Sequence, residues 1–391
     1  MSIFHTESKI IITCNKRLSP YLQQEVEALG FKPTRVWQTG VELVGTVTDT
    51  IALNLNLRCA SQVLYLLKSF TAADPKQLYD ELVQIEWEEY IDFSGFFSVT
   101  SNVNNEHILT PLFANVKVKD AIVDRIKDKK GIRPNSGADN NKTVVSLYWQ
   151  DDKADIYLDT SGETLAKHSY RKIPGKAPML EALATSTIMA TNWDRNSTFI
   201  NPMCGSGTLA IEAALLATDK HPGLFRMNYG FMHLMGYDEQ EFFVERRKLK
   251  DKAKKAVDFK IIATDISEDA IDIARKNANT AGVEHLIEFY VCDFEDTEVP
   301  EGGGVIMFNP EYGERLGVHS KLEITYKRMG DFLKKKALGY RGYVFTGNPD
   351  LAKKIGLKAA RRIEFYNGKL DCRLFEYELY EGSKREPKET E

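Results

Sequence analysis

The chain has few cysteines and no close pair of them. Five cysteines are scattered over 391 residues, and no two form a Cys-x-x-Cys pair. They are Cys14, Cys59, Cys204, Cys292 and Cys372. Structural zinc sites depend on closely spaced ligands, and disulfides persist only in oxidising compartments. We therefore expect reduced thiols, a cytoplasmic location and no metal site.

Long apolar runs and an excess of basic residues are also missing. No stretch approaches the roughly 18 apolar residues of a membrane-spanning helix. The N-terminus lacks the basic-then-apolar pattern of a signal peptide, so we expect no membrane partner. The net charge is -4, from 52 Lys and Arg against 56 Asp and Glu. A nucleic-acid partner would therefore have to be bound by local basic patches.

A glycine-containing motif opens the second half of the chain. Residues 201–208 read NPMCGSGT, between a partly β-branched stretch at 197–200 and an Ala- and Leu-rich stretch at 209–217. These flanks predict a strand and a helix, with Gly205 and Gly207 in the turn between them. Such a turn lets a ligand approach bare backbone and points helix N–H groups toward it. Alone, the motif fits an ordinary glycine-rich loop equally well.

Acidic residues downstream indicate which ligand the turn would bind. A nicotinamide dinucleotide site needs a further glycine and an acid roughly 20 residues on, and the chain has neither. Instead Asp265 closes the predicted strand at 261–264, where it can accept hydrogen bonds from ribose hydroxyls. Asp293 follows the next predicted strand and can accept from an adenine amino group, with Phe294 covering the ring. This pattern favours S-adenosylmethionine, although Asp293 also fits a solvated loop acid.

A second motif supplies groups suited to an aromatic amine. Residues 309–313 read NPEYG, directly after a predicted strand at 302–308. Open α/β sheets bind ligands at the carboxyl ends of their strands, so both motifs should lie on one rim. The exocyclic amine of guanine or adenine is a poor nucleophile, because its lone pair is delocalised into the ring. The Asn309 side-chain oxygen and the Pro310 carbonyl can accept from its hydrogens and favour a pyramidal nitrogen.

The remaining chemistry follows from position. Tyr312 can stack on a base taken out of its helix. No strong base is needed early, since the proton can leave after methyl transfer. The rate gain then comes mainly from holding the amine in line with the sulfonium methyl. Alone, this motif also fits a Pro-Gly turn after a strand.

Further motifs extend over nearly the whole chain. They are VKDAIVDR at 118–125, GIRP at 131–134, LDTSGE at 158–163, YR at 170–171, Ala177, Pro178 and Glu181, YGERLG at 312–317, TGN at 346–348 and YNGKLDCRL at 366–374. With the two motifs above, they resemble THUMP-domain methyltransferases that modify the N2 amine of a guanine in 23S ribosomal RNA. The resemblance implies S-adenosyl-L-methionine as cofactor and catalytic roles for Asn309, Pro310 and Tyr312. It implies a cofactor site made of Asn201, Met203, Gly205, Gly207, Thr208, Asp265, Ile266, Asp293, Phe294 and Asn309.

The resemblance also implies a fold and its division. The fold class is α/β: a Rossmann-like doubly wound methyltransferase domain preceded by an α+β THUMP/ferredoxin-like RNA-binding region. We expect a ferredoxin-like α+β unit at 1–54, a THUMP domain at 55–170 and the methyltransferase domain at 171–382. Residues 383–391 are charged and contain proline, so we expect a disordered tail there.

The chain departs from the family pattern in two places. The second motif of the family usually reads Asn-Pro-Pro-Tyr, and here Glu311 takes the third position. Residues 166–171 read AKHSYR, where the family is closer to LHKRGYR. Because Asn309, Pro310 and Tyr312 are intact, we expect activity to be retained.

Two basic stretches offer phosphate contacts, at residues 117–133 and 246–255. The alternative for each is a solvated helix face. In the first stretch the resemblance favours RNA binding. The residues that we expect to bind RNA there are Lys117, Lys119, Arg125, Lys127, Lys130 and Arg133.

The motifs predict an S-adenosylmethionine-dependent methyltransferase, and the resemblance implies that its substrate is the N2 amine of a guanine in 23S rRNA, either free or in a large-subunit precursor. One alternative is an adenine-N6 methyltransferase on RNA or DNA, because the second motif alone serves either amine. Another is a catalytically silent RNA-binding protein, for which Glu311 is the only support. The sequence leaves the oligomeric state open.

Overall fold

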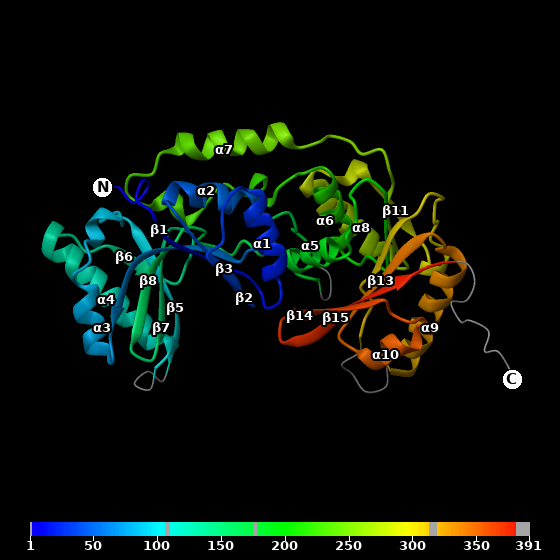
Figure 1. Ribbon diagram of the computed structural model, residues 1–391. Coiled ribbons are helices and arrows are strands. Elements are labelled where there is room, and N and C mark those ends of the chain that lie inside the picture. Colours follow the sequence, from blue (N-terminus) through cyan, green and yellow to red (C-terminus); the bar gives the residue numbers. More distant parts are fainter. Residues whose placement is uncertain (1, 106–109, 175–177, 313–318, 381–391) are drawn as a thin grey trace. The chain divides into compact units, whose positions relative to one another are not determined.

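The computed structural model describes residues 2–105, 110–174, 178–312 and 319–380. The chain forms two compact units (Figure 1). The first comprises Met1–Ser169 with His221–Ala253, and the second comprises Tyr170–Lys220 with Lys254–Glu391. None of the helices in these described ranges combines the length and apolar character needed to cross a bilayer.

The first unit is built on a mixed sheet. Among the described residues it has eight strands in the order β2-β3-β1-β4-β8-β7-β5-β6. Only the β5–β6 and β5–β7 pairs are parallel. The strands are β1 (Ser8–Thr13), β2 (Arg35–Trp37), β3 (Gly40–Gly45), β4 (Gln62–Thr71), β5 (Phe96–Asn104), β6 (Asn135–Gly137), β7 (Thr143–Gln150) and β8 (Lys153–Asp159).

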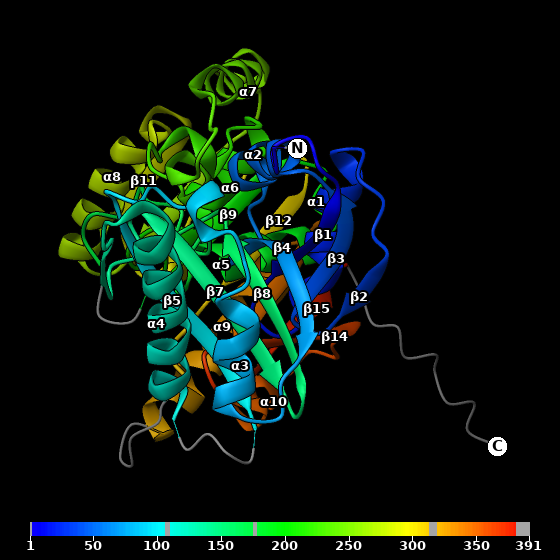
Figure 2. The same ribbon diagram turned by 90° about the vertical axis from the view of Figure 1, so that its left-hand side faces the viewer.

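Three helices of this unit, α2, α3 and α7, begin at a residue whose side chain caps them. The Asp74 carboxylate accepts from the backbone N–H groups of Lys76 and Gln77 at 2.8 and 2.9 Å, and so caps α3. Helices α3 and α4 pack side by side beside β5 and β4 (Figure 2). The helices are α1 (Ser19–Ala28), α2 (Val47–Asn56), α3 (Pro75–Leu82), α4 (Pro111–Lys130) and α7 (Glu239–Lys252).

The segment His221–Ala253 returns to the first unit by specific contacts. The Arg226 guanidinium donates to the carbonyls of Ser161 and Glu163 at 2.7 and 2.8 Å. The amide of Asn56 at the end of α2 donates to the Glu245 carboxylate of α7 at 3.0 Å. The Arg226 bonds satisfy backbone carbonyls that loops otherwise leave to solvent, and together with the Asn56 bond they fix where His221–Ala253 packs.

The second unit is a doubly wound α/β structure. In the described part of this unit the sheet has the order β11-β10-β9-β12-β13-β15-β14. All pairs are parallel except those made by β15, which runs antiparallel to β13 and β14. The strands are β9 (Thr198–Pro202), β10 (Ile261–Asp265), β11 (Ile287–Val291), β12 (Gly304–Phe308), β13 (Tyr340–Thr346), β14 (Arg361–Asn367) and β15 (Leu370–Glu378).

Burial explains why this sheet takes helices on both faces. All five residues of β9 are buried, as a parallel strand covered from both sides requires. Helices α5 (Glu181–Ala190), α6 (Thr208–Ala217) and α8 (Glu268–Ala281) lie on one side, and α9 (His319–Lys336) and α10 (Pro349–Lys354) lie on the other (Figure 1). The fold class predicted from the sequence is thus confirmed. Strand order reverses between β9 and β12, which is where such sheets bind ligands.

Candidate functional site

The glycine turn between β9 and α6 uses its two glycines differently. Both have positive φ, 55° at Gly205 and 80° at Gly207. A Cβ on Gly207 would lie 2.8 Å from the Ala274 Cβ of α8, so this glycine is required by helix packing. A Cβ on Gly205 would meet no described atom within 4 Å. Gly205 therefore leaves open space over bare backbone, as close approach of a ligand needs.

Asp265 holds this turn in place. Its Oδ2 accepts from the Gly205 N–H at 2.9 Å, and its Oδ1 accepts from the Ser267 N–H at 3.0 Å. The Cys204 N–H donates to the Thr264 carbonyl at 2.9 Å and ties the turn to the end of β10. Each carboxylate oxygen can accept a second hydrogen bond. Asp265 can therefore shape the turn and still accept from ligand hydroxyls.

Ile266 lies next to this carboxylate and is 73% exposed. An apolar side chain so exposed at the carboxyl end of β10 offers a surface for a flat apolar ring. Met203 also departs from ordinary backbone, with φ of 56°, and its side chain packs against the core. A positive φ in a methionine is strained and is typical of functional turns.

Asn201 links the two central strands. Its side-chain nitrogen donates to the Met307 carbonyl at 2.9 Å, which joins β9 to β12. Its side-chain oxygen is buried, and no described residue donates to it. A buried acceptor without a donor is unusual in proteins and indicates a group that a ligand or water would satisfy.

Asp293 and Phe294 follow β11. The Asp293 Oδ1 accepts from the Glu295 N–H at 3.0 Å and lies 2.9 Å from the Arg328 Nη2 of α9. Burial raises the pKa of Asp293, but the Glu295 N–H and the Arg328 guanidinium outweigh it and hold the pKa below its ordinary value. The carboxyl is therefore an ionised acceptor at neutral pH.

The Phe294 ring belongs to the hydrophobic core. It is 6% exposed and packs edge-on against Phe308 and Phe332, with centroids 5.9 and 6.3 Å away. The Arg328 guanidinium lies over it, 5.0 Å from the centroid. Sequence reasoning missed this core role, and its assignment to the cofactor stays a prediction.

The second motif forms a turn directly after β12. The Tyr312 hydroxyl donates to the Asn309 side-chain oxygen at 3.5 Å and accepts from the Asn367 side-chain nitrogen at 3.3 Å. The Tyr312 ring is partly buried and meets Phe345 edge-on at 6.3 Å between centroids. Burial raises the pKa of Tyr312 to about 12. The hydroxyl is thus a neutral donor aimed at Asn309, a relation that the sequence analysis did not anticipate.

The backbone of this turn is held from two other elements. The Tyr326 hydroxyl of α9 donates to the Glu311 carbonyl at 3.3 Å, and the Asn348 amide donates to the Tyr312 carbonyl at 3.4 Å. The Glu311 side chain is exposed, and no described residue pairs with its carboxylate. Pro310 is buried. Asn348 and Asn367 lay inside recognised motifs, but nothing in the sequence gave them a partner.

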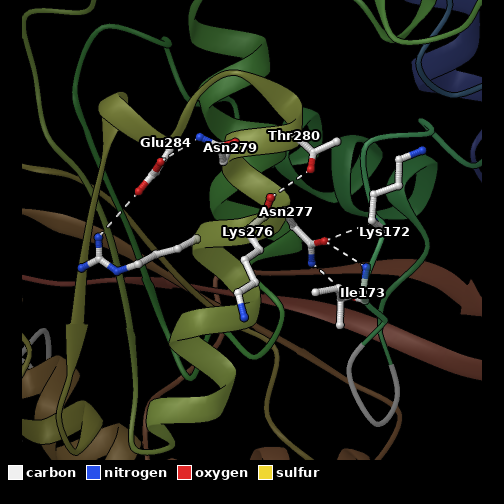
Figure 3. A pocket seen from close by; sticks show the side chains of 8 residues that line it. Lys172, Ile173, Lys276, Asn277, Asn279, Thr280 and Glu284 are labelled. Atoms are coloured by element: carbon white, nitrogen blue, oxygen red, sulfur yellow. Dashed lines mark hydrogen bonds and ion pairs between the residues drawn. The ribbon is translucent and has the colours of Figure 1, made fainter.

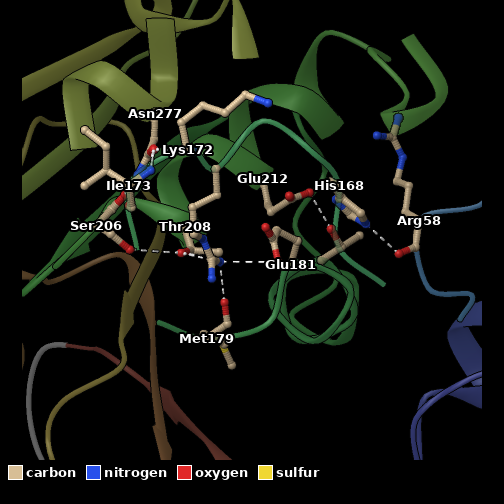
Figure 4. A network of polar contacts seen from close by, with 12 residues as sticks. Arg58, His168, Lys172, Ile173, Met179, Glu181, Ser206, Thr208, Glu212 and Asn277 are labelled. Atoms are coloured by element: carbon tan, nitrogen blue, oxygen red, sulfur yellow. Dashed lines mark hydrogen bonds and ion pairs between the residues drawn. The ribbon is translucent and has the colours of Figure 1, made fainter. Parts of the chain in front are cut away.

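The start of α6 is fixed by a buried ion pair. The Arg171 guanidinium lies 3.4 Å from the Glu181 carboxylate, donates to the Thr208 hydroxyl at 3.1 Å and also donates to the Met179 carbonyl. Figure 4 shows Met179, Glu181 and Thr208 converging on this position. Thr208 is buried, and its hydroxyl, which the sequence analysis assigned to the cofactor, already accepts a hydrogen bond from Arg171.

Asn277 of α8 connects the incoming chain to the glycine turn. Its side-chain oxygen accepts from the N–H groups of Lys172 and Ile173 at 3.2 and 3.3 Å. Its nitrogen donates to the carbonyls of Ile173 and Ser206 at 3.1 and 3.3 Å. Figure 3 shows this amide against Lys172 and Ile173, and Figure 4 shows it with Ser206 as well. All four hydrogen-bonding positions of the amide are used, so Asn277 fixes the turn from behind.

The basic stretch at 117–133 covers most of α4 and the loop after it. Lys127, Lys130 and Arg133 are exposed, whereas Lys117 and Lys119 are partly buried. Arg125 is only 17% exposed and lies 2.8 Å from the Glu88 carboxylate, which also accepts from its Nε. Its charge is therefore already paired within the first unit. In the second basic stretch, the Arg246 guanidinium donates to carbonyls at 223 and 224, which gives it a structural role.

No cluster of three or more potential metal ligands occurs among the residues whose structure is described.

Comparison with known families covers most of the chain. Residues 168–376 match an RMKL-like methyltransferase domain, residues 9–64 match an RlmL ferredoxin-like domain, and residues 72–159 match a THUMP domain. These matches confirm the resemblance drawn from the sequence motifs.

The named relatives of this chain are methyltransferases as well. The chain is 34% identical over 384 residues to the ribosomal RNA large subunit methyltransferase K/L of Syntrophotalea carbinolica, covering 95% of this chain and 54% of that protein. It is 35% identical to the protein of the same name from Psychromonas ingrahamii, covering 93% and 49%. The chain thus spans about half the length of these relatives.

Among structures, SMU.472, described as a methyltransferase and solved with SAH, superposes with a TM-score of 0.86 at 25% identity, covering 96% of this chain and 99% of that chain. A structure described as a methylase from Clostridium difficile superposes at 0.87 with 29% identity, covering 97% and 100%. The family match spans more than half of the chain and contains both the glycine turn and the second motif. This chain belongs to the family of RMKL-like methyltransferase domains.

Proposed function

We propose that this protein transfers a methyl group from S-adenosylmethionine to the N2 amine of a guanine in 23S rRNA. One observation carries the proposal: the two motifs end neighbouring parallel strands, β9 and β12, at the point where strand order reverses. The Asn201 amide bonds directly across this pair. A donor bound over the glycine turn and an amine held by Asn309 would therefore lie side by side.

The residues of the first motif fit the proposed cofactor. Gly205 leaves room for it, the Asp265 carboxylate can accept from ribose hydroxyls, and Ile266 offers an apolar surface to the adenine. Asp293 stays ionised and can accept from the adenine amine. When bound, the cofactor supplies an electrophilic methyl group on a sulfonium. A related structure, SMU.472, was solved with SAH.

The second motif fits the amine. The Asn309 oxygen and the Pro310 carbonyl would accept from its two hydrogens and leave the nitrogen lone pair pointing at the methyl group. The Tyr312 hydroxyl has a pKa of about 12, so at neutral pH it orients Asn309 and does not act as a base. The proton can leave the amine after transfer. Positioning supplies most of the rate enhancement.

Guanine is favoured over adenine by Glu311. Its exposed carboxylate has no partner among the described residues, and the Tyr326 hydroxyl fixes its carbonyl. Guanine presents a ring N–H beside its N2 amine, and a carboxylate can accept a hydrogen bond from this N–H. Adenine presents a ring nitrogen that is itself an acceptor, so the same carboxylate would repel it.

Adenine-N6 methylation remains the second candidate because of one neighbour. A structure from Listeria monocytogenes, described as a predicted N6-adenine-specific DNA methylase, superposes with a TM-score of 0.84 at 28% identity, covering 96% of this chain and 97% of that chain. The RlmL ferredoxin-like and THUMP domain matches, together with the named ribosomal RNA relatives, support RNA and guanine instead.

RNA is the proposed partner of the first unit as well. We infer that residues 1–54 and 55–170 position ribosomal RNA, or a large-subunit precursor, and that the domain beginning near residue 171 performs the transfer. Lys127, Lys130 and Arg133 are exposed for phosphate contacts. Because the proposed substrate is ribosomal RNA, we place the enzyme in the cytoplasm.

A nucleoside assay tests the function directly. Purified protein, labelled S-adenosylmethionine and unmodified 23S rRNA should yield N2-methylguanine by mass spectrometry, and Asn309→Ala should yield none while still binding S-adenosylhomocysteine. The same assay on single-stranded DNA should give no product. Formation of N6-methyladenine without N2-methylguanine would overturn the proposal in favour of the second candidate.

A further inference from the structure

A basic hollow lies on the second unit, beside the edge of its sheet. It has a volume of about 360 Å³ and is lined by residues of α10, of the segment that follows it, and of β14 and β15. Its cationic lining residues are Lys353, Lys358, Arg362 and Arg373, and no acidic side chain lines it among the residues that the structure describes. Figure 1 shows α10, β14 and β15 as neighbours in this unit.

Two of these four cations are already neutralised. Lys353 lies 2.8 Å from the Asp350 carboxylate, and Arg373 pairs with Asp371 and Glu364. Such pairs on an exposed surface leave little charge for an external anion.

The other two cations are available. Lys358 and Arg362 are exposed, and neither forms an ion pair with any carboxylate in the described ranges. The Arg362 guanidinium lies 5.9 Å from the centroid of the Phe375 ring, which holds it over the floor of the hollow. Phe375 and Tyr377 of β15 are themselves buried in the core. The hollow thus has a rigid aromatic floor with two unpaired cations at its rim.

Elements on both sides of the hollow form hydrogen bonds with Tyr312 of the second motif. Asn348 caps α10 by accepting from the N–H groups of Asp350 and Leu351, and its amide donates to the Tyr312 carbonyl. On the other side, β14 ends at Asn367, whose amide donates to the Tyr312 hydroxyl. The elements that line the hollow are therefore the ones that position Tyr312.

We propose that this hollow, defined by Lys358, Arg362 and the Phe375 floor, binds the phosphate backbone of RNA that flanks the target base. The inference rests on the proposed function and extends it, because it gives the methyltransferase unit its own RNA contact in addition to the basic stretch of the first unit. A flanking phosphate held here would bring the adjoining nucleotide toward the turn at 309–312. Two unpaired cations at the rim of the hollow suit a phosphate backbone.

Sheet-edge protection is the competing explanation. β14 is the edge strand of its sheet, and charged side chains on an edge discourage pairing with another chain. That role requires charge at the edge but no contact with RNA. Reversing the charges, which keeps the edge charged, separates the two explanations.

The test compares two double variants of the full-length protein with equal charge change. Lys358→Glu with Arg362→Glu alters the hollow. Lys276→Glu with Lys335→Glu alters two exposed lysines of the same unit, on α8 and α9, which form no ion pair with a described carboxylate and lie outside the hollow. Binding of a single-stranded 23S rRNA fragment is measured by fluorescence anisotropy over a salt series, together with S-adenosylhomocysteine affinity and methylation kinetics.

The hollow variant should bind RNA at least about tenfold more weakly, and its slope of log affinity against log salt should flatten by about 1.4, since each phosphate contact to a single strand adds about 0.7. The KM for RNA should rise while kcat and S-adenosylhomocysteine affinity stay unchanged. The control variant should match the wild type in slope. The single variant Lys358→Glu, at an exposed position, should show about half of the slope change.

Different failures have different meanings. Equal weakening of RNA binding in both double variants would show a net-charge effect, and unchanged binding in the hollow variant would leave only edge protection. Either result overturns the inference. The proposed function still stands in both cases if the wild type methylates RNA. If the wild type neither binds nor methylates RNA, the proposed function fails and the inference falls with it.

Discussion

The Tyr312 hydroxyl donates to the Asn309 side-chain oxygen at 3.5 Å and is itself held by the Asn367 amide at 3.3 Å. A residue expected to act through its ring is thereby connected to the acceptor that would hold the amine. Asn309 keeps a further lone pair on the same oxygen, so this contact can fix its orientation without blocking the substrate.

Tyr312→Phe separates the hydroxyl from the ring. The variant keeps the aromatic surface but loses the bond that orients Asn309, so we expect kcat to fall about tenfold, which corresponds to roughly 1.4 kcal/mol. Tyr312→Ala should be more severe because stacking is worth a further 1–3 kcal/mol or so. Single-turnover methylation measures both, and Tyr290→Phe serves as control, because Tyr290 is exposed and its hydroxyl donates to the Glu288 carboxylate. Full activity of Tyr312→Phe would show that the hydroxyl has no role.

Asp265→Ala tests the glycine turn. The substitution removes an acceptor for the ligand and also the bond to the Gly205 N–H, so S-adenosylhomocysteine binding should weaken by about 1–3 kcal/mol in calorimetry. Asp269→Ala, at an exposed position in the first turn of α8, changes the charge equally and should bind normally. If Asp265→Ala binds as tightly as the wild type, Asp265 does not belong to the site.

Arg328→Gln should change how binding depends on pH. Burial alone raises the pKa of Asp293, and the Glu295 N–H and Arg328 bring it below its ordinary value. Because the pKa of Asp293 is lowered, its carboxylate stays ionised through the pH range in which an ordinary carboxyl group titrates. It is protonated only as the pH falls through the lowered pKa. Without Arg328 that pKa rises, so the acid limit of S-adenosylhomocysteine binding should move to higher pH.

Calorimetry at several pH values between about 4 and 8 would record the shift. Lys335→Gln, on the exposed surface of the same helix, is the matched control. Superimposable pH profiles for Arg328→Gln and the wild type would mean that Asp293 does not contact the cofactor.

Arg125 and its neighbours on α4 should behave differently from one another. Lys127→Glu with Lys130→Glu should weaken RNA binding and flatten its salt dependence, because both side chains are exposed. Arg125→Ala should instead lower stability by about 1–3 kcal/mol, since it leaves the Glu88 carboxylate without its bidentate partner. Urea unfolding and RNA titration together distinguish the two. A larger loss of RNA affinity in Arg125→Ala than in the lysine pair would contradict this division.

Local patterns were sufficient for the strands that precede the two motifs and for the helix that follows the glycine turn. Buried runs such as β9 and β12, and glycines at a strand-to-helix turn, leave few alternatives, and both motifs follow the predicted strands. The return of His221–Ala253 to the first unit had no local signal, because it depends on carbonyls that only the folded chain brings to Arg226. For the same reason the Arg125–Glu88 pair was invisible in a stretch that reads simply as basic.

The candidate site shows a similar division. Gly205, Asp265 and Asn309 could be assigned to the site from the sequence alone, because the turn needs a glycine and the ligands need hydrogen-bond acceptors. The partners that hold other site residues come from distant elements: Asn367, the last residue of β14, donates to Tyr312, and Arg328 of α9 pairs with Asp293. The Asn201 side-chain oxygen is buried without a donor among the described residues, because its amide nitrogen bonds across to Met307 of β12. No local pattern predicts that β9 and β12 are adjacent.

Glu311 allows the sharpest test of base identity. The family's proline at this position cannot accept a hydrogen bond through its side chain, whereas the exposed Glu311 carboxylate can accept from the ring N–H of guanine. If it does so, Glu311→Pro and Glu311→Gln should both lower kcat/KM for RNA, and Glu311→Gln should lower it less because the amide retains an acceptor. Asn309 and the Tyr326 bond to the backbone at 311 are untouched by Glu311→Gln, so that variant isolates the charge. Methylation rates on guanine- and adenine-containing versions of one RNA would measure the effect. Equal or higher activity in Glu311→Pro would show that the carboxylate is a tolerated substitution in a turn shaped by Pro310, and base selection would then have to come from RNA positioning alone.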